Sequence, residues 1–194
     1  AHSSVGSPSG AAPEMTLMPR GDRFGPTEAA VPLLFAEADG YISIEAHNCS
    51  RTAGNASAGL VVVPDMGKTA SSLMMKPVAV PPQEDPAHGI YAEYDIELRR
   101  SGSAELTLLF SPSFNFNGNR GLRYAISVDG GPEQTMNING EYNEKEEPRW
   151  YDWQKERIIR SSTSHDFTAA GSHTIRVRFI DPGLVLQKLP IDTG

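Results

Sequence analysis

The sequence contains a single cysteine, Cys49, so no disulfide within the chain can stabilise its fold. A chain of 194 residues is long enough to be held together by one hydrophobic core. It also lacks any apolar run close to the roughly 20 residues that a helix needs to cross a bilayer. Its first residues lack the basic and apolar regions of a signal peptide. The sequence therefore predicts a packed domain that is not inserted in a membrane.

Basic residues are in the minority. There are 17 lysines and arginines against 24 acidic residues, which gives a formal net charge of -7. A nucleic-acid backbone or an anionic membrane surface would repel such a chain, so neither is an expected partner. The share of hydrophobic residues, 39%, and of charged residues, 21%, is typical of a globular domain.

Motifs of catalytic sites are missing as well. The run Met66–Thr69 resembles the end of a phosphate-binding loop, but Val62 stands where that loop needs its first glycine. No Gly-x-Ser-x-Gly elbow occurs, and the histidines lack the spacing of a zinc site. Paired carboxylates of a glycosidase have no spacing rule by which a sequence could identify them. We therefore expect this region alone not to be an enzyme.

What the chain does contain is alternation of apolar and polar residues, which is typical of half-buried strands. Turn sequences such as Asp129-Gly130 and Asn139-Gly140 separate these segments in the manner of hairpins. The pattern predicts an all-β protein, an antiparallel β-sandwich of the jelly-roll type. The alternating segments are residues 41–46, 92–98, 106–110, 122–128 and 175–179.

Two other segments have a different character. Residues 1–33 are rich in serine, glycine, alanine and proline and show no sustained periodicity, which predicts an extended leader or linker before a sandwich domain over 34–194. From about Trp150 to Arg160 the spacing predicts a short helix, although Tyr151, Trp153 and Lys155 also fit one face of a strand.

Aromatic residues gather near that short helix and are the best candidates for ligand contacts. Sugar rings present apolar C–H faces rimmed by hydroxyls, so a flat aromatic ring with amide or guanidinium groups beside it is a suitable receptor. The alternative is that these aromatic residues anchor the core, which we favour for Trp153. The candidate carbohydrate-binding residues are Tyr142, Trp150, Tyr151, Asn115, Asn117 and Arg120.

Six short blocks occur in an order that resembles the C-terminal domain of glycoside hydrolase family 115, the xylan α-glucuronidases. The resemblance covers residues 34–194. Its last two blocks belong to a run, residues 171–192, that joins a strand, an Asp-Pro-Gly turn and a second strand. The blocks are 41–46, 63–69, 93–95, 121–129, 171–174 and 181–192.

This resemblance implies a β-sandwich accessory domain similar to carbohydrate-binding modules. In the family such a domain is attached to a catalytic region that removes 4-O-methylglucuronic acid from xylan. None of the family's acid or base positions lies in the matched blocks, so no catalytic residue is carried over. The resemblance also implies a secreted or periplasmic protein. Leu60 stands where the family would have a tryptophan, which removes one aromatic surface.

Some sandwich modules similar to this one hold a structural calcium ion between an early-strand glutamate and the last strand. The corresponding candidates here are Glu45 and Asp192. Calcium binds about six or more oxygen ligands, and the sequence identifies two. The other interpretation is a surface glutamate and a turn-capping aspartate. No further cofactor is expected.

Two functions follow from these observations. As a carbohydrate-binding module, the domain would bind a xylan-type polysaccharide or oligosaccharide through exposed aromatic side chains. As a structural or dimerisation domain, it would bury the same side chains against a catalytic region or a second subunit.

Overall fold

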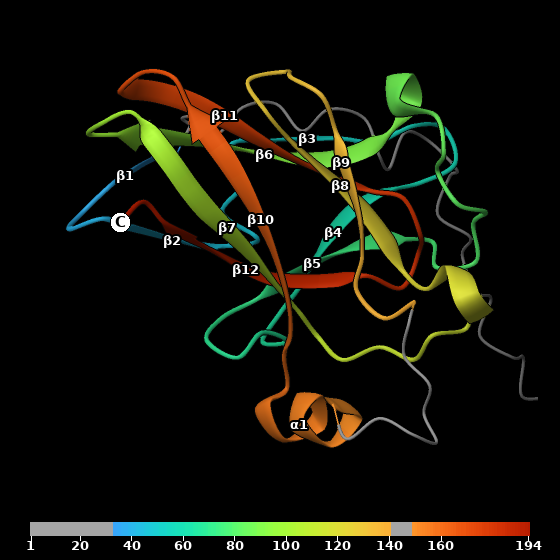
Figure 1. Ribbon diagram of the computed structural model, residues 1–194. Coiled ribbons are helices and arrows are strands. Elements are labelled where there is room, and N and C mark those ends of the chain that lie inside the picture. The colour runs from blue at the N-terminus through green and yellow to red at the C-terminus, as the bar shows by residue number, and fades with distance from the viewer. Residues whose placement is uncertain (1–32, 141–148) are drawn as a thin grey trace, which may run out of the picture.

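The computed structural model describes residues 33–140 and 149–194. Two β-sheets, in which antiparallel pairs predominate, lie face to face and enclose the core between them (Figure 1). The predicted β-sandwich is confirmed. The predicted leader falls almost entirely outside the described residues, so it stays a prediction.

The first sheet has the strand order β1-β6-β11-β8-β9, with β3 pairing β6 as well. Within it β1 runs parallel to β6, and the other neighbours are antiparallel. Its strands are β1 (Leu34–Ala36), β3 (Arg51–Ala53), β6 (Ile90–Leu98), β8 (Arg123–Val128), β9 (Gln134–Asn137) and β11 (Gly171–Phe179).

The second sheet has the order β10-β7-β12-β5-β4, with β2 also pairing β12. All its pairs are antiparallel. Its strands are β2 (Tyr41–Glu45), β4 (Gly59–Val63), β5 (Ser72–Lys76), β7 (Gly102–Phe110), β10 (Ile159–Phe167) and β12 (Val185–Asp192). Within residues 33–140 and 149–194, three short helices lie outside the sheets: η1 (Pro86–His88), η2 (Gly118–Arg120) and α1 (Arg149–Glu156).

Large aromatic side chains from both sheets fill the centre. Phe110 on β7 meets Tyr124 on β8 with 5.1 Å between ring centroids, and both are completely buried. Buried phenols need hydrogen-bond partners. The Tyr124 hydroxyl donates to Ser161 Oγ at 2.9 Å, and burial raises the pKa of Tyr124 to about 12. The Tyr94 hydroxyl donates to the Ala46 carbonyl at 2.8 Å. The core is thus largely apolar, and both of its buried phenols are paired.

The five predicted strands are all present, and so is the strand–turn–strand order at the C-terminal end. The short helix is present too, as α1, but it ends at Glu156 because Ile159 already begins β10. Strand β10 is not among the predicted strands. This strand directs Ser161 and Thr163 inward where apolar residues are expected, so its alternation is not visible as hydrophobicity.

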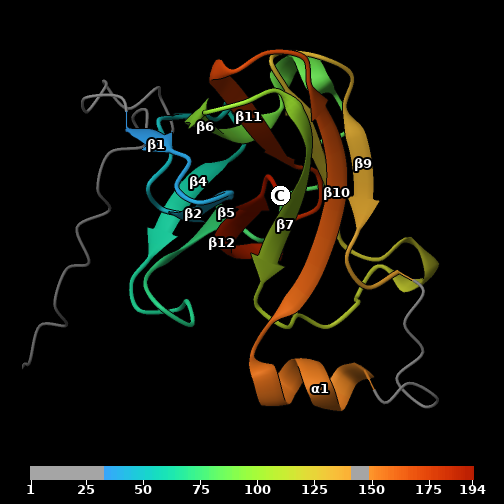
Figure 2. The same cartoon turned by 60° about the vertical axis from the view of Figure 1, so that its left-hand side comes forward.

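The connections at one end of the sandwich form the region of interest. Strand β7 ends there at Phe110, β12 begins beside it, and β10 starts there after α1. Loop 111–122, the turn at 180–184 and α1 therefore meet at this end, which we call the α1 end (Figure 2). The β6–β7 turn and Gly194 lie at the opposite end. In the described part of the chain no helix is long and apolar enough to cross a membrane.

Candidate functional site

Two phenylalanines project from loop 111–122 into solvent. Phe114 is 63% exposed and Phe116 is 62% exposed, although burial of such a side chain is worth about 1.5–3 kcal/mol. The residues between and after them, Asn115 and Asn117, are partly buried. The loop therefore alternates like a strand, with its aromatic side chains turned outward.

Asparagine side chains hold this loop in place. Asn115 Nδ2 donates to the Gly118 carbonyl at 2.5 Å, and Asn117 Nδ2 donates to the Gly121 carbonyl at 3.0 Å. From the far side Asn139, which is buried, donates to the Ser113 carbonyl at 2.9 Å and accepts from the Leu122 amide at 2.9 Å. Both ends of the loop are thus tied to one side chain, which keeps the phenylalanines in fixed positions.

Replacing Asn139 with alanine is expected to lower the free energy of unfolding by about 1–3 kcal/mol, because the Leu122 amide loses its partner in a buried place. Chemical denaturation would measure the change. Asn137→Ala is not a neutral control, because the Asn137 side chain also accepts from backbone amides. Asn48→Ala, on a distant turn, is a neutral control. Equal losses at Asn139 and Asn48 would contradict the role assigned to Asn139.

Helix α1 places further aromatic rings beside the loop. The rings of Phe114 and Trp150 lie with centroids 4.9 Å apart and planes tilted by 30°. Trp150 meets Trp153 edge-on at 6.5 Å, and Trp153 packs against the hydrophobic core. Tyr151, on the outer side of the helix, is 77% exposed. Ring contacts therefore run from the core through Trp153 and Trp150 to Phe114. We call Phe114, Phe116, Trp150 and Tyr151, the aromatic side chains at the α1 end, the aromatic surface.

Phe116 rests on the turn that follows β11. A Cβ atom on Gly183 would lie 2.8 Å from the Phe116 ring, and the positive φ of 95° at Gly183 also favours glycine. Two residues earlier, the buried carboxylate of Asp181 accepts from Arg123 Nε at 2.8 Å and lies 3.7 Å from Arg120 Nη2. Arg120 keeps 46% of its side chain exposed. The turn thus positions an aromatic ring and a guanidinium group at the same end.

The predicted contact residues have different surroundings. Tyr151 and Arg120 are exposed and Trp150 is half-buried, so the structure brings these three to the α1 end. Asn115 and Asn117 are there too, but their amide groups bond to the loop backbone. Tyr142 lies outside the described residues. Sequence reasoning did not select Phe114 and Phe116, although their alternation with the two asparagines was a visible signal.

Comparison with known protein families identifies the family of this chain. The model of the glycosyl hydrolase family 115 C-terminal domain matches residues 34–194. The chain belongs to this family. The resemblance found in the sequence is therefore confirmed. No curated protein sequence matches the chain.

Solved structures similar to this family 115 domain show the fold. One is a family 115 4-O-methyl-α-glucuronidase, BtGH115A, with specificity for decorated arabinogalactans. It has a TM-score of 0.60 and 12% sequence identity, and the match covers 78% of this chain and 17% of that one. Another is a family 35 carbohydrate-binding module from Clostridium thermocellum. It has a TM-score of 0.50 and 14% sequence identity, and the match covers 79% of this chain and 98% of that one. An exo-β-1,3-galactanase from Phanerochaete chrysosporium has TM-score 0.50, 14% identity, and coverage of 80% and 30%. The domain thus spans a small part of its enzyme relative and nearly all of a binding module.

The two calcium candidates of the family 115 domain do not meet. Glu45 pairs with Lys188 in the register of β2 and β12, whereas Asp192 pairs with Tyr41 at the other end of the same ladder. Glu45 Oε1 accepts from Thr69 Oγ1 at 2.7 Å and from Lys188 Nζ at 3.0 Å. Asp192 caps the Gly194 amide at 2.9 Å. Among the described residues no group of three or more histidine, cysteine or acidic side chains could hold a metal ion.

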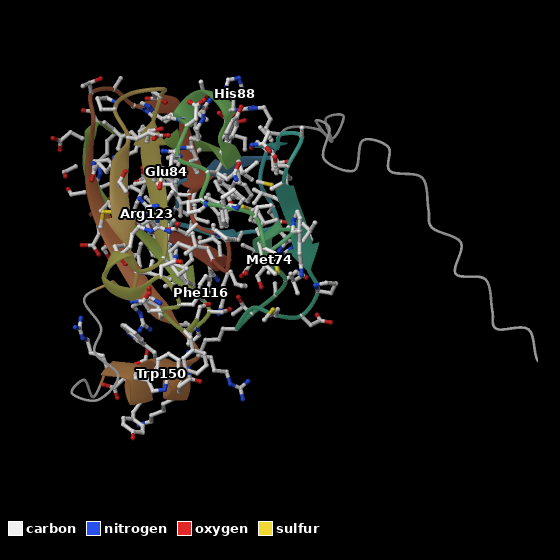
Figure 3. The ribbon with its side chains drawn as sticks, turned by 90° about the vertical axis from the view of Figure 1, so that its right-hand side faces the viewer. Met74, Glu84, His88, Phe116, Arg123 and Trp150 are labelled. Carbon is white, nitrogen blue, oxygen red and sulfur yellow. The ribbon has the colours of Figure 1, made fainter. Side chains whose placement is uncertain are left out.

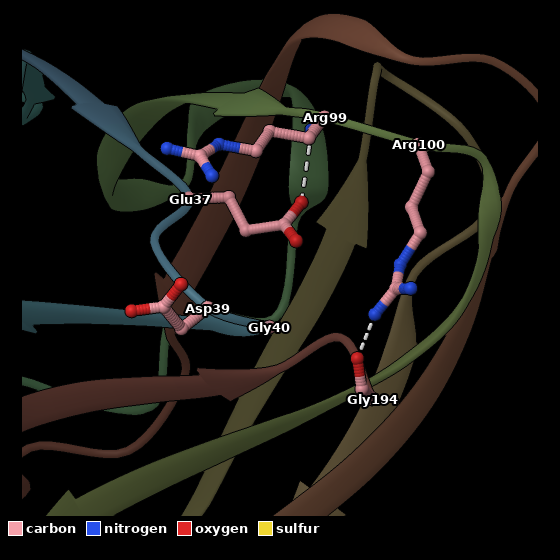
Figure 4. Close-up of a pocket in the computed structure, with 6 residues that line it drawn as sticks. All are labelled: Glu37, Asp39, Gly40, Arg99, Arg100 and Gly194. Atoms are coloured by element: carbon pink, nitrogen blue, oxygen red, sulfur yellow. Dashed lines mark hydrogen bonds between the residues drawn. The ribbon is translucent and has the colours of Figure 1, made fainter.

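Two cavities lie away from the exposed phenylalanines. One, of about 310 Å³, is at the opposite end of the sandwich, where Glu37 accepts from the Arg99 amide and Arg100 bonds to the Gly194 carbonyl (Figure 4). The other, of about 320 Å³, lies between β9 and α1 and includes Asn137, Arg149 and Trp153 in its lining. Neither cavity includes a residue of the aromatic surface.

Proposed function

We propose that this family 115 domain is an accessory module that binds a xylan-type glycan on the aromatic surface at the α1 end. The observation that carries the proposal is the pair of phenylalanines held outward on a loop whose asparagine side chains are bonded to its own backbone. Structural likeness to a carbohydrate-binding module supports the same class of function.

The chemistry of the surface suits a sugar. Rings of Phe114, Trp150 and Phe116 offer faces and edges on which apolar C–H faces can stack. Arg120 offers guanidinium donors beside them, and hydroxyl oxygens are suitable acceptors. Because Asn115 and Asn117 already fix the loop, little conformational entropy is lost when a glycan binds. We assign these two asparagines a positioning role.

The proposal assigns no catalytic step to this region. Asp181, on the turn below Phe116, is completely buried and bonded to Arg123, so it serves the architecture of the turn. A polysaccharide ligand of the plant cell wall would be met outside the cytoplasm, and a secreted or periplasmic location is part of the proposal.

Calorimetric titration with glucuronoxylan tests this function. Phe114→Ala and Trp150→Ala are each expected to weaken binding by about tenfold to a hundredfold, since a stacked aromatic ring contributes on the order of 1–3 kcal/mol. Decorated arabinogalactan is the second ligand to titrate, because the family 115 structural relative acts on it.

The matched control is Tyr41→Ala. Tyr41 is 47% exposed, on β2 and at the end of the sandwich opposite to α1. It should bind as the unmodified domain does. Absence of saturable heat with both polysaccharides, or an equal loss in the Tyr41 variant, would refute the proposal.

A docking surface for a catalytic region or a second subunit is the alternative, and one observation favours it. Phe114, Phe116 and Tyr151 are three large exposed side chains at the α1 end, and such side chains are enriched at protein interfaces. Under this alternative the isolated domain self-associates or binds its catalytic region in sedimentation experiments, and Phe114→Ala abolishes the association while no glycan binds.

A further inference from the structure

Ordered polar side chains continue from Phe116 along one side of the molecule. Figure 3 shows Trp150, Phe116, Arg123, Glu84 and His88 following one another along that side, from α1 to η1. We call Arg120, Arg123, Glu84, Asp85 and His88 the polar track. Contacts between neighbouring groups connect it to the aromatic surface through the Asp181–Gly183 turn.

A chain of hydrogen bonds orders the middle of the track. Asp181 has no exposed surface and anchors Arg123, whose Nη2 then bonds to Glu84 Oε1 at 2.6 Å. The side chain of Glu84 is nevertheless 60% exposed. The bond from Arg123 holds the pKa of Glu84 below its usual range, so this carboxylate stays charged. An exposed carboxylate is usually free to rotate, whereas this one presents its remaining lone pairs in a fixed direction.

The upper part of the track is fixed through its backbone. The Gln83 amide donates to the Ile180 carbonyl at 2.7 Å, which ties this segment to the turn below Phe116. Asn55 Nδ2 donates to the His88 carbonyl at 2.9 Å. Asp85 caps η1 by accepting from the Ala87 amide at 2.9 Å, and its other oxygen lies 2.8 Å from His88 Nδ1. His88 Nε2 is thereby directed away from Asp85, with 79% of the side chain exposed.

The track is open at its sides. The side chains of Glu84, Asp85 and His88 are 60%, 62% and 79% exposed, so they lie on the surface and are not enclosed. A site that selects the end of a sugar chain needs walls that enclose the terminal ring, as ligand pockets do. An open row of aromatic and then polar groups instead lets a chain enter and leave at both ends.

We propose that the polar track extends the glycan-binding surface, so that the domain binds internal segments of a long polysaccharide rather than chain ends. This inference rests on the proposed function. Rings at the α1 end stack on one part of the chain. The carboxylate of Glu84 accepts from sugar hydroxyls further along it, and the guanidinium groups and His88 donate to or accept from others. Because the carboxylates of Glu84 and Asp85 are already ordered, bonds to this part of the surface carry a small entropic cost.

Fragments of increasing length, prepared from glucuronoxylan and from arabinogalactan, test the inference. The readout is the ratio of the affinity for long fragments to that for the shortest fragment that binds. In the unmodified domain this ratio is expected to reach about tenfold or more, the effect of one or two charge-assisted hydrogen bonds. In the double variant Glu84→Gln, His88→Ala the ratio should fall close to one. Asp166→Asn, an exposed carboxylate on β10, is the control and should keep the full ratio.

The outcomes separate the two proposals. Binding that does not strengthen with length, or a length dependence that persists in the double variant, overturns the inference and leaves the proposed function standing. Equal binding of fragments with blocked and with free chain ends supports it further. No binding of any fragment overturns both. Thermal unfolding of the double variant shows whether it is folded, and Glu84→Gln alone, which keeps the shape of the side chain, is the second variant.

Discussion

Replacing Asp181 with alanine is expected to lower the free energy of unfolding by about 3–5 kcal/mol, the usual cost of removing one partner from a buried ion pair. Asp181 has no exposed surface and receives bonds from both the backbone amide and the side chain of Arg123. Without it, the guanidinium group of Arg123, 18% exposed, faces the turn unpaired on that side. Urea denaturation followed by fluorescence would give the difference.

Asp181→Asn keeps the shape and one acceptor, so we expect a smaller loss than with alanine. Asp166→Ala on the exposed side of β10 is the control for removing one negative charge, and it should stay within about 0.5 kcal/mol of the unmodified domain. If the Asp181→Ala and Asp166→Ala variants are equally stable, the buried ion pair contributes nothing to the free energy of unfolding. The claim that Asp181 orders Glu84 through Arg123 would then be wrong.

Phe110→Ala is expected to cause a loss of similar size, about 3–5 kcal/mol, because it removes a completely buried ring and leaves a cavity. Phe110 is the last residue of β7, and its ring packs against Tyr124. The cavity would therefore open directly behind loop 111–122. Calorimetric unfolding would measure the fall in stability, and glycan affinity should fall as well.

Phe114→Ala is a closely matched control, since it removes the same ring four residues further along. Phe114 is 63% exposed, so its loss should change stability by about 0.5 kcal/mol or less while it weakens glycan binding. The two variants therefore separate packing from recognition. A strongly destabilised Phe114 variant beside a stable Phe110 variant would reverse the assignment of core and surface.

Much of the fold could be predicted because the strands bury one face and expose the other. Ile42 and Ile44 on β2, and Tyr94 and Ile96 on β6, are buried as their spacing predicts. Strand β10 escaped this reasoning because its inward positions carry hydroxyl groups, whose burial is made favourable by partners elsewhere in the fold. One such partner is the phenol of Tyr124, which bonds to Ser161, and no local pattern reveals it.

The candidate site could be predicted in its location but not in the roles of its residues. Aromatic composition led to Trp150 and Tyr151, and both lie at the α1 end. Which side chains of loop 111–122 turn outward depends on hydrogen bonds to Asn139, which follows β9 and is distant in sequence. The calcium candidates Glu45 and Asp192 depend on strand register in a similar way. Register places them at opposite ends of the β2–β12 ladder, and the sequence alone does not reveal that register.

Because asparagine side chains hold loop 111–122 in place, the loop is susceptible to deamidation. Asn117 and Asn139 are each followed by glycine, and asparagine is among the residues that heat degrades most readily. Deamidation would turn each donating nitrogen into a carboxylate oxygen facing a carbonyl, at Gly121 and at Ser113 respectively. The bond would become a repulsion, while the distant core strands would keep their packing. An aged sample would then have the spectrum of a folded sandwich and a loop that no longer holds its phenylalanines in place.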